Sequence, residues 1–431
     1  MKNLIYLFIV FLFIGCDDFV DEAPKGKKIP DKLIDLHYMM QPMFDNQANG
    51  IYVAPITQFY MSDDVEVGIN DFLSGPALNA YLFEEHFYTG TQVDEGYASL
   101  FSAIYVCNYV LQNIDVVEDN PGDEIEPEHV KGNALFNRAL NHFMAINTYA
   151  DHYTKDNTTN GLPYVTAADI NQSFTQQSVQ DFYAKILEDL DEALELLPEQ
   201  SDWRTGSKLA VHALKARIYM YMGDYEKAAL SGIEALTIDD SLDDAKTWPG
   251  QTYYWQEWAS PATIFYKKVF ALSGFRGRMT DDLVSLLKDD DYRKNWTIEL
   301  PTGGVGFGWG TKPSNAGLSR GGLYLDAIES LTKQSAPDLD KAKELMSVFL
   351  THRYSNPQDI SSISNEELYQ LTLDQRRIEF CSVGTRLYDI KRLNNIENAN
   401  IDVIHNYDGE TYSLKADSEG WHIPLPANVS F

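Results

Sequence analysis

Small and apolar residues recur every three or four positions over most of the chain, which is the period of an α-helix. The clearest case is 209–238, where such residues lie on both sides of Gly223 and Asp224. We expect two helices here, joined by a tight turn and packed closely because alanines line both of them. The spacing fits the tetratricopeptide pattern, and such a helix pair needs neighbouring helices to cover its apolar face.

The same period predicts helices before and after this pair. Apolar stripes indicate them at 31–43, 97–117, 127–153, 178–198, 323–331, 339–353 and 366–393. Ser178, with Asp181 three residues later, is typical of a helix N-terminus. Asn108 lies on an apolar stripe, and we expect it to be a hydrogen-bonded core residue. Residues 45–96 are rich in Gly, Pro, Asn and aromatic side chains, which favours loops with short helices.

Residues 239–319 interrupt the helical period. Acidic turns alternate with aromatic clusters, and the apolar run 262–270 is compatible with a strand. Residues 303–310 read GGVGFGWG, which favours an exposed ribbon or loop. We therefore expect a single unit over 31–431. Its helical-repeat core, about 97–238 and 320–393, encloses a loop-rich region over about 239–319.

The N-terminus is typical of a secreted lipoprotein. Residues 4–14 form an unbroken apolar run after Lys2, which is too short to cross a bilayer and has the length of a signal-peptide core. Gly15 and Cys16 follow it directly, as in a bacterial lipoprotein box. We expect cleavage of residues 1–15, lipid on Cys16 and a flexible tether over 16–30, so that the lipid alone attaches the chain to a membrane. The alternative is an ordinary secreted protein with a chance cysteine.

The strongly negative net charge argues against nucleic acid and anionic lipid as binding partners. With 34 basic and 64 acidic residues the net charge is −30, and loss of the single lysine in residues 1–15 leaves −31. Such a chain does not attract nucleic acid or anionic lipid electrostatically. Beyond Cys16 the cysteines are Cys107 and Cys381, each within an expected helix, and we interpret them as buried thiols.

Sequence patterns for catalysis or metal binding find little support. Residues 317–321 match G-x-S-x-G, but a Gly/Pro/Asn-rich loop precedes them where a nucleophile elbow needs a strand. The histidines lack metal-ligand spacing, and the acidic clusters at 239–244 and 289–291 lack the spacing of a calcium loop, so solvated turns are favoured. With 64 acidic residues, no carboxylate pair for glycoside hydrolysis stands out. We expect no catalytic residue, metal or cofactor.

Several segments, in order along the chain, resemble the SusD/RagB family of surface lipoproteins. They are the lipobox at Gly15-Cys16, FNRALNHF at 136–143 with GLPY at 161–164, the run 178–198, LKARIYMYMGDYEKA at 214–228, and RRIEFCSVGTRLYDIKR at 376–392. Val383 departs from the family pattern, which usually has glutamate before the glycine that is Gly384 here. The resemblance extends over almost the whole chain.

This resemblance implies both a fold and a function. The fold would be mostly helical and SusD-like, with tetratricopeptide-type helix pairs as scaffold and a long loop-rich region facing the ligand. The function would be to capture an oligosaccharide at the cell surface and deliver it to a SusC-like TonB-dependent outer-membrane transporter. The alternatives are a peptide or another small nutrient as ligand, a helical glycoside hydrolase, or an interaction scaffold without a small ligand.

The C-terminal motif at 376–392 has its own physical interpretation. Residues three apart on a helix can form ion pairs, and Arg386, Asp389 and Arg392 have this spacing, as do Arg376 and Glu379. A ligand or partner contact is one hypothesis for these charges. We favour a structural network that fixes the last helix to the core.

Aromatic residues outside the helix stripes are the candidate ligand contacts. A sugar ring can lie flat on Trp or Tyr, and five rings fall in the loop-rich region: Tyr253, Trp255, Trp258, Trp296 and Trp309. For each of them a locally packed ring is an equally good interpretation. Trp203 and Trp421 lie beside family motifs, and we expect them to serve packing.

Overall fold

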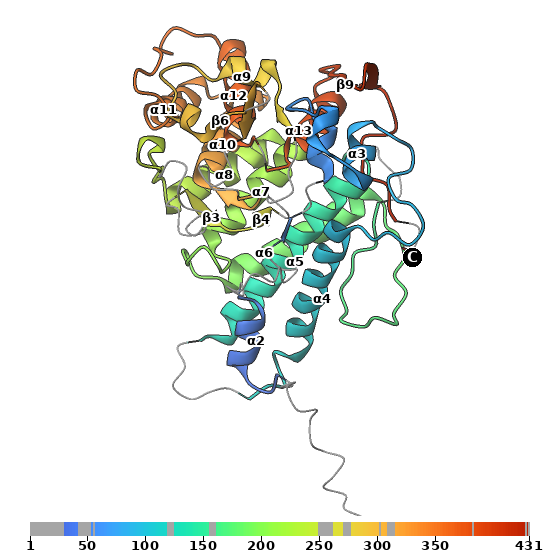
Figure 1. Ribbon diagram of the computed structural model, residues 1–431. Helices are drawn as coiled ribbons and strands as arrows, with labels where there is room; N and C mark the ends of the chain where they lie inside the picture. Colours follow the sequence, from blue (N-terminus) through green and yellow to red (C-terminus); the bar gives the residue numbers. More distant parts are fainter. Residues whose placement is uncertain are drawn as a thin grey trace, which may run out of the picture.

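The structure is a computed structural model that describes residues 30–41, 53–54, 57–118, 125–154, 161–248, 262–269, 277–300, 303–307, 315–381, 383–426 and 429 (Figure 1). The expected leader at 1–15, Cys16 and the tether up to residue 29 lie outside the described residues. Their assignments therefore stay predictions.

Helices dominate the described part of the chain. The α-helices are α2 Leu33–Met39, α3 Gly75–Tyr81, α4 Glu95–Asn113, α5 Pro127–Tyr149, α6 Val179–Leu196, α7 Lys208–Tyr221, α8 Tyr225–Ile238, α9 Asp281–Leu286, α10 Arg320–Lys333, α11 Leu339–Thr351, α12 Asn365–Glu379 and α13 Arg386–Ile396. The 3-10 helices are η4 Thr57–Met61, η5 Ile69–Asp71, η6 Ala245–Thr247 and η9 Tyr292–Trp296. The expected mostly helical fold is confirmed.

The strands are short and pair two by two. Their bounds are β1 Val53–Ala54, β2 Val65–Glu66, β3 Thr263–Phe265, β4 Lys268–Val269, β5 Arg278–Met279, β6 Thr297–Glu299, β7 Val305–Phe307, β8 Leu318–Ser319, β9 Val403–Tyr407 and β10 Glu410–Leu414. β1 pairs with β4 in parallel, and β2–β5, β3–β8, β6–β7 and β9–β10 are antiparallel. The apolar run at 262–270 and the ribbon at 303–310 thus contribute β3, β4 and β7.

The helices stack largely in chain order. α4 packs on α5 and α5 on α6, while α7 packs on α8, and α8 on α10, which also contacts α11 and α12. In Figure 1, α4, α5 and α6 lie in the lower half, and α10 to α13 lie above them. Each helix therefore covers the apolar face of the next, as the sequence pattern requires.

The α7–α8 pair has the close packing that its small residues predict. Gly223 forms the turn with φ 70°, a conformation that favours glycine, and its N–H donates to Met220 O at 3.1 Å. Asp224 caps α8 by accepting from the Lys227 N–H. On α8, a Cβ placed on Gly232 would lie 2.9 Å from the Cβ of Ala327 on α10, so the two helices touch through small residues.

One hydrophobic cluster runs through the described chain from Leu33 to Ile423. α5 is buried along most of its length. The polar residues around α5 are hydrogen-bonded: Asn108 donates to Val165 O at 3.0 Å and accepts from Arg138 at 2.9 Å, which confirms its expected core role. Cys107 and Cys381 are buried, as expected.

Two features differ from the sequence-based expectations. The helical run expected over 366–393 is instead two helices, α12 and α13, because the chain turns between them at Gly384, where φ is 82°. The hairpin β9–β10 was not predicted from the sequence. Its turn residues Asp408 and Gly409 both have positive φ, as a two-residue hairpin turn requires.

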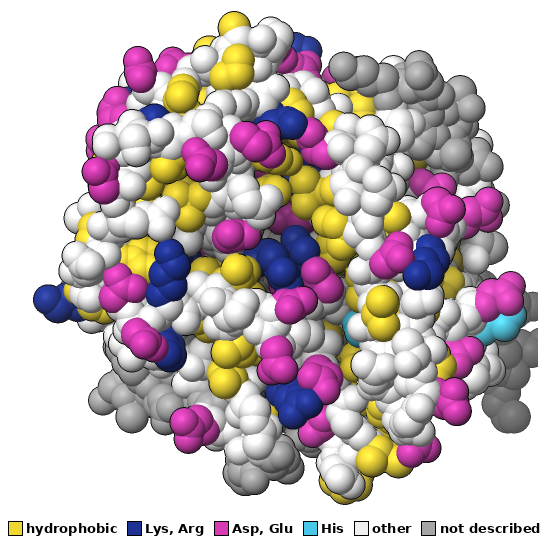
Figure 2. Space-filling view, turned by 90° about the horizontal axis from the view of Figure 1, so that it is seen from above, with side chains coloured by type: hydrophobic (Ala, Val, Ile, Leu, Met, Phe, Trp, Pro, Cys, Tyr) yellow, Lys and Arg dark blue, Asp and Glu magenta, His cyan; other side chains and the backbone are white. Residues whose placement is uncertain are grey.

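Charges of both signs lie side by side on the upper face of the molecule (Figure 2). Ion pairs at the surface of the described chain include Lys341–Glu344 at 2.8 Å and Lys294–Asp289 at 2.6 Å. Among the helices that the structure describes, none is both long and apolar enough to cross a membrane.

Candidate ligand-binding site

Most of the predicted ring contacts fall on segments outside the described residues. Tyr253, Trp255 and Trp258 lie within 249–261, and Trp309 lies within 308–314. Trp296 ends η9, but its side chain is also outside the described part. The described structure therefore locates the ends of these segments, and the rings themselves stay predictions.

Three of the four residues that flank the ring-bearing segments 249–261 and 308–314 meet at one small pocket, which we call the loop base. Trp248 and Ala262 flank 249–261, and Asn315 follows 308–314. All three line this pocket of about 20 Å³ together with Thr263, Ser319, Glu379, Phe380 and Val383. The pairing of β3 with β8 joins these ends, because Thr263 lies opposite Ser319 and Phe265 opposite Leu318.

Asn315 fixes the point where the chain returns from 308–314. Its Oδ1 accepts from the N–H groups of Lys267 and Gly317, each at 2.8 Å, and its Nδ2 donates to Phe265 O at 3.0 Å and Leu318 O at 3.1 Å. The side chain thus replaces backbone hydrogen bonds between the β3 and β8 segments. A Cβ on Gly317 would lie 2.3 Å from Phe265 O, so this close approach needs glycine.

Arg353 fixes the start of 249–261. Its Nη1 donates to Asp243 O at 2.7 Å, and its guanidinium lies over the Trp248 ring, 5.2 Å from the centroid. The N–H of Ala245 donates to His352 O at 3.0 Å, which ties η6 to the end of α11. The residue before the first ring-bearing segment is therefore held by the residues that directly follow α11.

Arg353 also holds η9, which ends at Trp296. The Tyr292 N–H donates to Arg353 O at 2.9 Å. Arg293 is fully buried; it donates to Asp291 from Nε at 3.0 Å and from Nη2 at 2.8 Å, and to Glu379 from Nη1 at 3.1 Å. Glu379 in turn accepts two hydrogen bonds from Arg353.

These residues form a buried group that we call the Arg353 cluster: Asp243, Asp291, Arg293, Arg353 and Glu379. Burial by itself lowers the pKa of Arg293, but the adjacent carboxylate of Asp291 and its other acceptors outweigh burial and raise it. Burial raises the pKa of Asp243, and Arg353 beside it opposes this. The arginines therefore stay charged and keep their acceptors in place.

The cluster corrects two expectations from sequence. Solvated turns were the favoured interpretation of 239–244 and 289–291, but Asp243 and Asp291 are buried and paired with arginines. Asp289 remains exposed, as expected. No group of side chains suited to holding a metal ion occurs among the described residues. Ser319, the serine of the G-x-S-x-G match, follows Leu318 in β8 and caps α10 by accepting from the Gly322 N–H.

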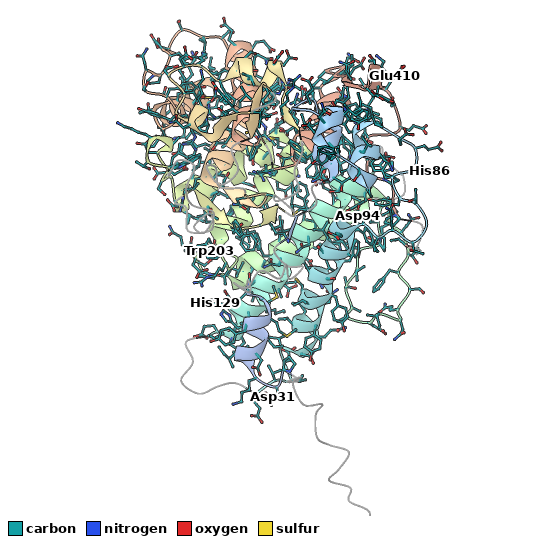
Figure 3. All side chains as sticks on the ribbon, viewed as in Figure 1. Asp31, His86, Asp94, His129, Trp203 and Glu410 are labelled. Carbon is teal, nitrogen blue, oxygen red and sulfur yellow. The ribbon has the colours of Figure 1, made fainter. Side chains whose placement is uncertain are left out.

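Two tryptophans expected to serve packing do so. Trp421 is 6% exposed, and its Nε1–H donates to Lys415 O at 2.9 Å. Trp203, labelled in Figure 3, packs edge-to-face against Tyr266, and Arg204 lies over its ring. Neither belongs to the loop base.

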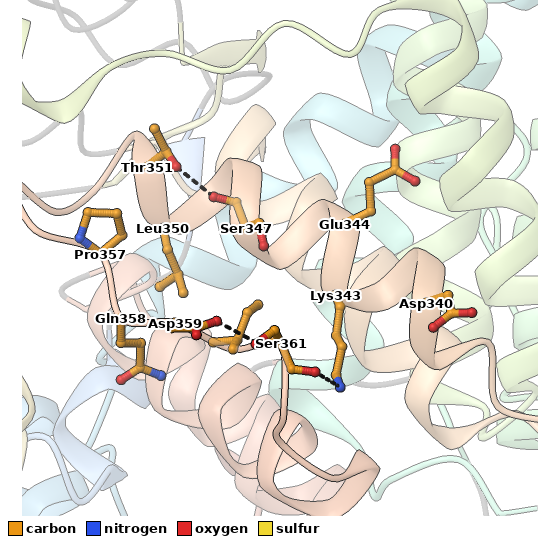
Figure 4. A pocket seen from close by; sticks show the side chains of 11 residues that line it. Asp340, Lys343, Glu344, Ser347, Leu350, Thr351, Pro357, Gln358, Asp359 and Ser361 are labelled. Atoms are coloured by element: carbon orange, nitrogen blue, oxygen red, sulfur yellow. Dashed lines mark hydrogen bonds between the residues drawn. The ribbon is translucent and has the colours of Figure 1, made fainter.

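A larger open groove of about 330 Å³ lies along α11 and the loop after it (Figure 4). It is lined by Asp340, Lys343, Glu344, Ser347, Leu350, Thr351, Pro357, Gln358, Asp359, Ile360 and Ser361. Lys343 donates to Ser361 O at 2.9 Å, and Asp359 accepts from the Ser361 N–H at 2.9 Å. Its lining residues include no aromatic ring, so the groove lacks the flat apolar platform that a sugar ring would use.

Comparison with known proteins agrees with this fold. Residues 18–220 match the SusD-like family model described as "Starch-binding associating with outer membrane". No curated protein sequence matches the chain significantly. Residues 18–220 of the chain are therefore similar in sequence to the SusD-like family.

Solved structures with a SusD-like fold are similar to this chain beyond residue 220. A SusD superfamily protein from Bacteroides thetaiotaomicron has a TM-score of 0.73 at 17% identity, over 92% of this chain and 96% of its own. One from Bacteroides fragilis has 0.72 at 18% identity, over 93% and 97%. A SusD-like carbohydrate binding protein from Bacteroides vulgatus has 0.64 at 19% identity, over 91% and 93%. At these identities the likeness concerns the fold.

The C-terminal motif at 376–392 is a structural network. Arg376 pairs with Asp326 of α10 and, from Nη2 at 3.0 Å, with Asp389 of α13. Arg392 pairs with Glu329 of α10 at 2.7 Å and with Asp389 at 3.5 Å. The motif thus fixes α12 and α13 to α10, and the structural interpretation is confirmed.

The partners of two motif residues differ from the local pairs expected. Arg386 donates two hydrogen bonds of 2.7 Å to Asp63 instead of pairing with Asp389. Burial alone raises the pKa of Asp63, but Arg386 outweighs it and lowers the pKa to about 2. Glu379 binds Arg353 and Arg293 instead of Arg376. Residues far apart in sequence supply these partners, and helical spacing cannot reveal them.

Proposed function

We propose that this protein is a SusD-like lipoprotein of the outer membrane that faces the cell surface, captures an oligosaccharide and delivers it to a SusC-like TonB-dependent transporter. It would bind its ligand without any chemical step and without a cofactor. The family description supports an association with starch and the outer membrane, and one similar structure is named a carbohydrate binding protein. Lipid on Cys16 would provide the membrane attachment.

The observation that carries the proposal is the common origin of the ring-bearing segments. The two residues that flank 249–261 and the residue that follows 308–314 all line the loop base. η9, which ends at Trp296, is tied to Arg353 of the cluster that also holds Trp248. The described residues next to these rings are therefore linked through buried contacts, which favours a shared site over isolated packed rings.

The expected affinity follows from the area of the sugar faces. Burying about 80–100 Å² of C–H surface on one ring gives roughly 2 kcal/mol. Two or three such platforms, less the cost of association, give dissociation constants of about 1 μM to 1 mM. This range suits a receptor that must pass its ligand on.

The test is a titration of residues 17–431 with soluble oligosaccharides and short peptides, followed by tryptophan fluorescence and calorimetry. We expect saturable binding of one oligosaccharide class. Trp255→Ala and Trp309→Ala should each weaken it by about 30-fold, the equivalent of roughly 2 kcal/mol. Trp421→Phe, which alters a buried packing residue, is the matched control and should leave affinity unchanged.

Other outcomes would redirect the proposal. Unchanged affinity in both loop variants would mean that the ligand binds elsewhere. Binding of peptides alone would indicate a peptide receptor. Release of reducing sugar during the titration would indicate a hydrolase.

A further inference from the structure

The loop base is too small for a sugar ring but large enough for one water molecule. Its volume is about 20 Å³, and a buried water needs roughly 10–15 Å³. Apolar side chains such as Phe380 form part of the lining, and the polar part includes Thr263, Ser319 and Glu379. A pocket of this size holds water when it offers two to four hydrogen-bonding partners, whereas a purely apolar one stays dry.

Thr263, the first residue of β3, has a buried hydroxyl at this pocket. The residue is 8% exposed, and its Oγ1 has no hydrogen-bond partner in the described chain. Thr263 lies opposite Ser319 across the β3–β8 pair, and both residues line the pocket. A hydroxyl that leaves water on folding and gains no partner destabilises the fold, so such groups are rare in folded proteins. The Thr263 hydroxyl therefore needs a partner that the described protein groups do not supply.

Two further polar side chains of the pocket can hydrogen-bond to a molecule beside Thr263. Ser319 accepts from the Gly322 N–H at 3.1 Å, and a serine hydroxyl can in addition donate one hydrogen bond and accept another. The carboxylate of Glu379 is an acceptor with about four lone-pair sites. Together with the Thr263 hydroxyl, these groups match the roughly three hydrogen bonds that a buried water makes.

The charges around the pocket favour a neutral molecule over an ion. Glu379 would repel an anion, while Arg353 and Arg293, which both pair with Glu379, would repel a cation. A water molecule carries no net charge, and it can donate to the carboxylate while it accepts from a hydroxyl. It therefore suits the mixture of acceptor and hydroxyl groups that line the pocket.

We propose that the loop base binds one buried water molecule, which donates to the Glu379 carboxylate and hydrogen-bonds to the Thr263 and Ser319 hydroxyls. This water links the two sides of 249–261. Trp248 precedes that segment and lies against Arg353, which donates to Glu379 at 2.9 Å. Thr263 begins β3 soon after the segment returns. The water thus extends the Arg353 cluster to the residue at which β3 starts, and it fills space that a ligand would otherwise have to occupy.

A high-resolution crystal structure of residues 17–431 tests the water site directly. We expect one spherical peak of electron density at about 2.5–3.0 Å from Thr263 Oγ1 and from an oxygen of Glu379 or Ser319. Thr263→Ser keeps the hydroxyl and should keep the peak. Thr263→Val removes the hydroxyl at nearly constant shape and should lose the peak.

The sign of the stability change in Thr263→Val is a second test, measured by urea denaturation. Valine suits a strand as well as threonine does, so the substitution mainly removes the hydroxyl. If a water bridges this hydroxyl, its removal should lower the folding equilibrium constant by about fivefold. If the hydroxyl is unpaired in a dry pocket, its removal should raise the constant by a similar factor or more. Thr411→Val, at an exposed position of β10, is the control and should change the constant by less than about twofold.

The water site stands or falls independently of the proposed function, because neither measurement uses a sugar or a transporter. A peak in the wild type together with a destabilised Thr263→Val variant would establish it. Absence of the peak, density for a molecule larger than water, or a Thr263→Val variant at least as stable as the wild type would overturn it.

Discussion

Arg353 donates two hydrogen bonds to Glu379, from Nε to Oε2 at 3.1 Å and from Nη2 to Oε1 at 2.9 Å. Both side chains are buried, and Glu379 also accepts from Arg293. A Cβ on Gly321 would lie 2.2 Å from Glu379 Oε1, so the glycine of α10 makes room for the carboxylate. Glu379 thus links Arg353, which contacts Trp248 before 249–261, to Arg293 of η9, which ends at Trp296.

Glu379→Ala should destabilise the protein by about 3–5 kcal/mol, because it leaves two buried arginines without their shared acceptor. Urea denaturation measures the loss. Glu344→Ala is the control: Glu344 is exposed and pairs with Lys341 at the surface, and its removal should cost less than about 1 kcal/mol. Similar losses in both variants would show that the Arg353 cluster contributes little to stability.

The Gly223 turn should tolerate substitution poorly. Proline cannot adopt φ 70° and has no N–H for Met220 O, so Gly223→Pro should cost about 3 kcal/mol or more. Gly223→Ala keeps the N–H and should cost about 1–2 kcal/mol for the left-handed backbone. Melting temperatures should fall in the order wild type, alanine variant, proline variant. Gly420→Ala, at an exposed position with 3.4 Å to its nearest neighbour, should melt like wild type. An unchanged melting temperature for Gly223→Pro would refute the structural role of the turn.

Acid should destabilise the fold in part through His142. Its Nδ1 contacts Arg138 O at 3.0 Å and its Nε2 accepts from the Val165 N–H at 3.1 Å, which is the pattern of a neutral ring. Burial, followed by the charge of Arg138, lowers the pKa of His142 well below 6.5. As pH falls below 6.5 the unfolded chain therefore takes up a proton that the folded chain does not, and stability decreases.

Urea denaturation at pH 8, 7, 6 and 5 measures this effect. In His142→Gln the loss of stability between pH 7 and 5 should be smaller than in the wild type. His129→Gln, at an exposed position of α5, should follow the wild-type curve. If His142→Gln also followed it, His142 would not contribute to the acid response.

Cys16→Ser should release the protein from membranes, because acyl chains on Cys16 would provide the anchor. Fractionation of cells into membrane and soluble proteins measures the change. Cys107→Ala, which removes a buried thiol, should remain in the membrane fraction. A membrane-bound Cys16→Ser variant would show that something other than this cysteine attaches the chain.

The helices could be predicted because each one needs only its own residues. The apolar stripe at 127–153 specifies α5, and the small residues at 209–238 specify both α7 and α8 with their turn. The hairpin β9–β10 also had a local signal, since Asp408 and Gly409 follow an alternating strand. The run 366–393 was predicted as one helix, whereas the structure has two, because the break between them depends on a single glycine, Gly384.

The site could be predicted only in part. Rings outside the helix stripes mark 249–261 and 308–314 as candidates, but Asn315 and Arg353 carry no local pattern of their own. The partner of Glu379 lies 26 residues away in Arg353 and 86 residues away in Arg293. A charge whose partner is so distant looks like any solvated charge in the sequence, which is why Asp243 and Asp291 were misassigned.

The hydrogen bonds that Asn315 makes to the β3 and β8 segments have a consequence for how the ligand specificity of such a protein can change. Hydrogen bonds and a buried arginine hold the chain on both sides of 249–261 and where it returns from 308–314, and the pairing of β7 with β6 holds Phe307 before 308–314. Substitutions, insertions or whole exchanges between these fixed points leave the scaffold unaltered. The residues that determine the fold are therefore separate from those expected to determine ligand specificity. A library that randomises only these two segments should yield receptors for new ligands on an unchanged scaffold.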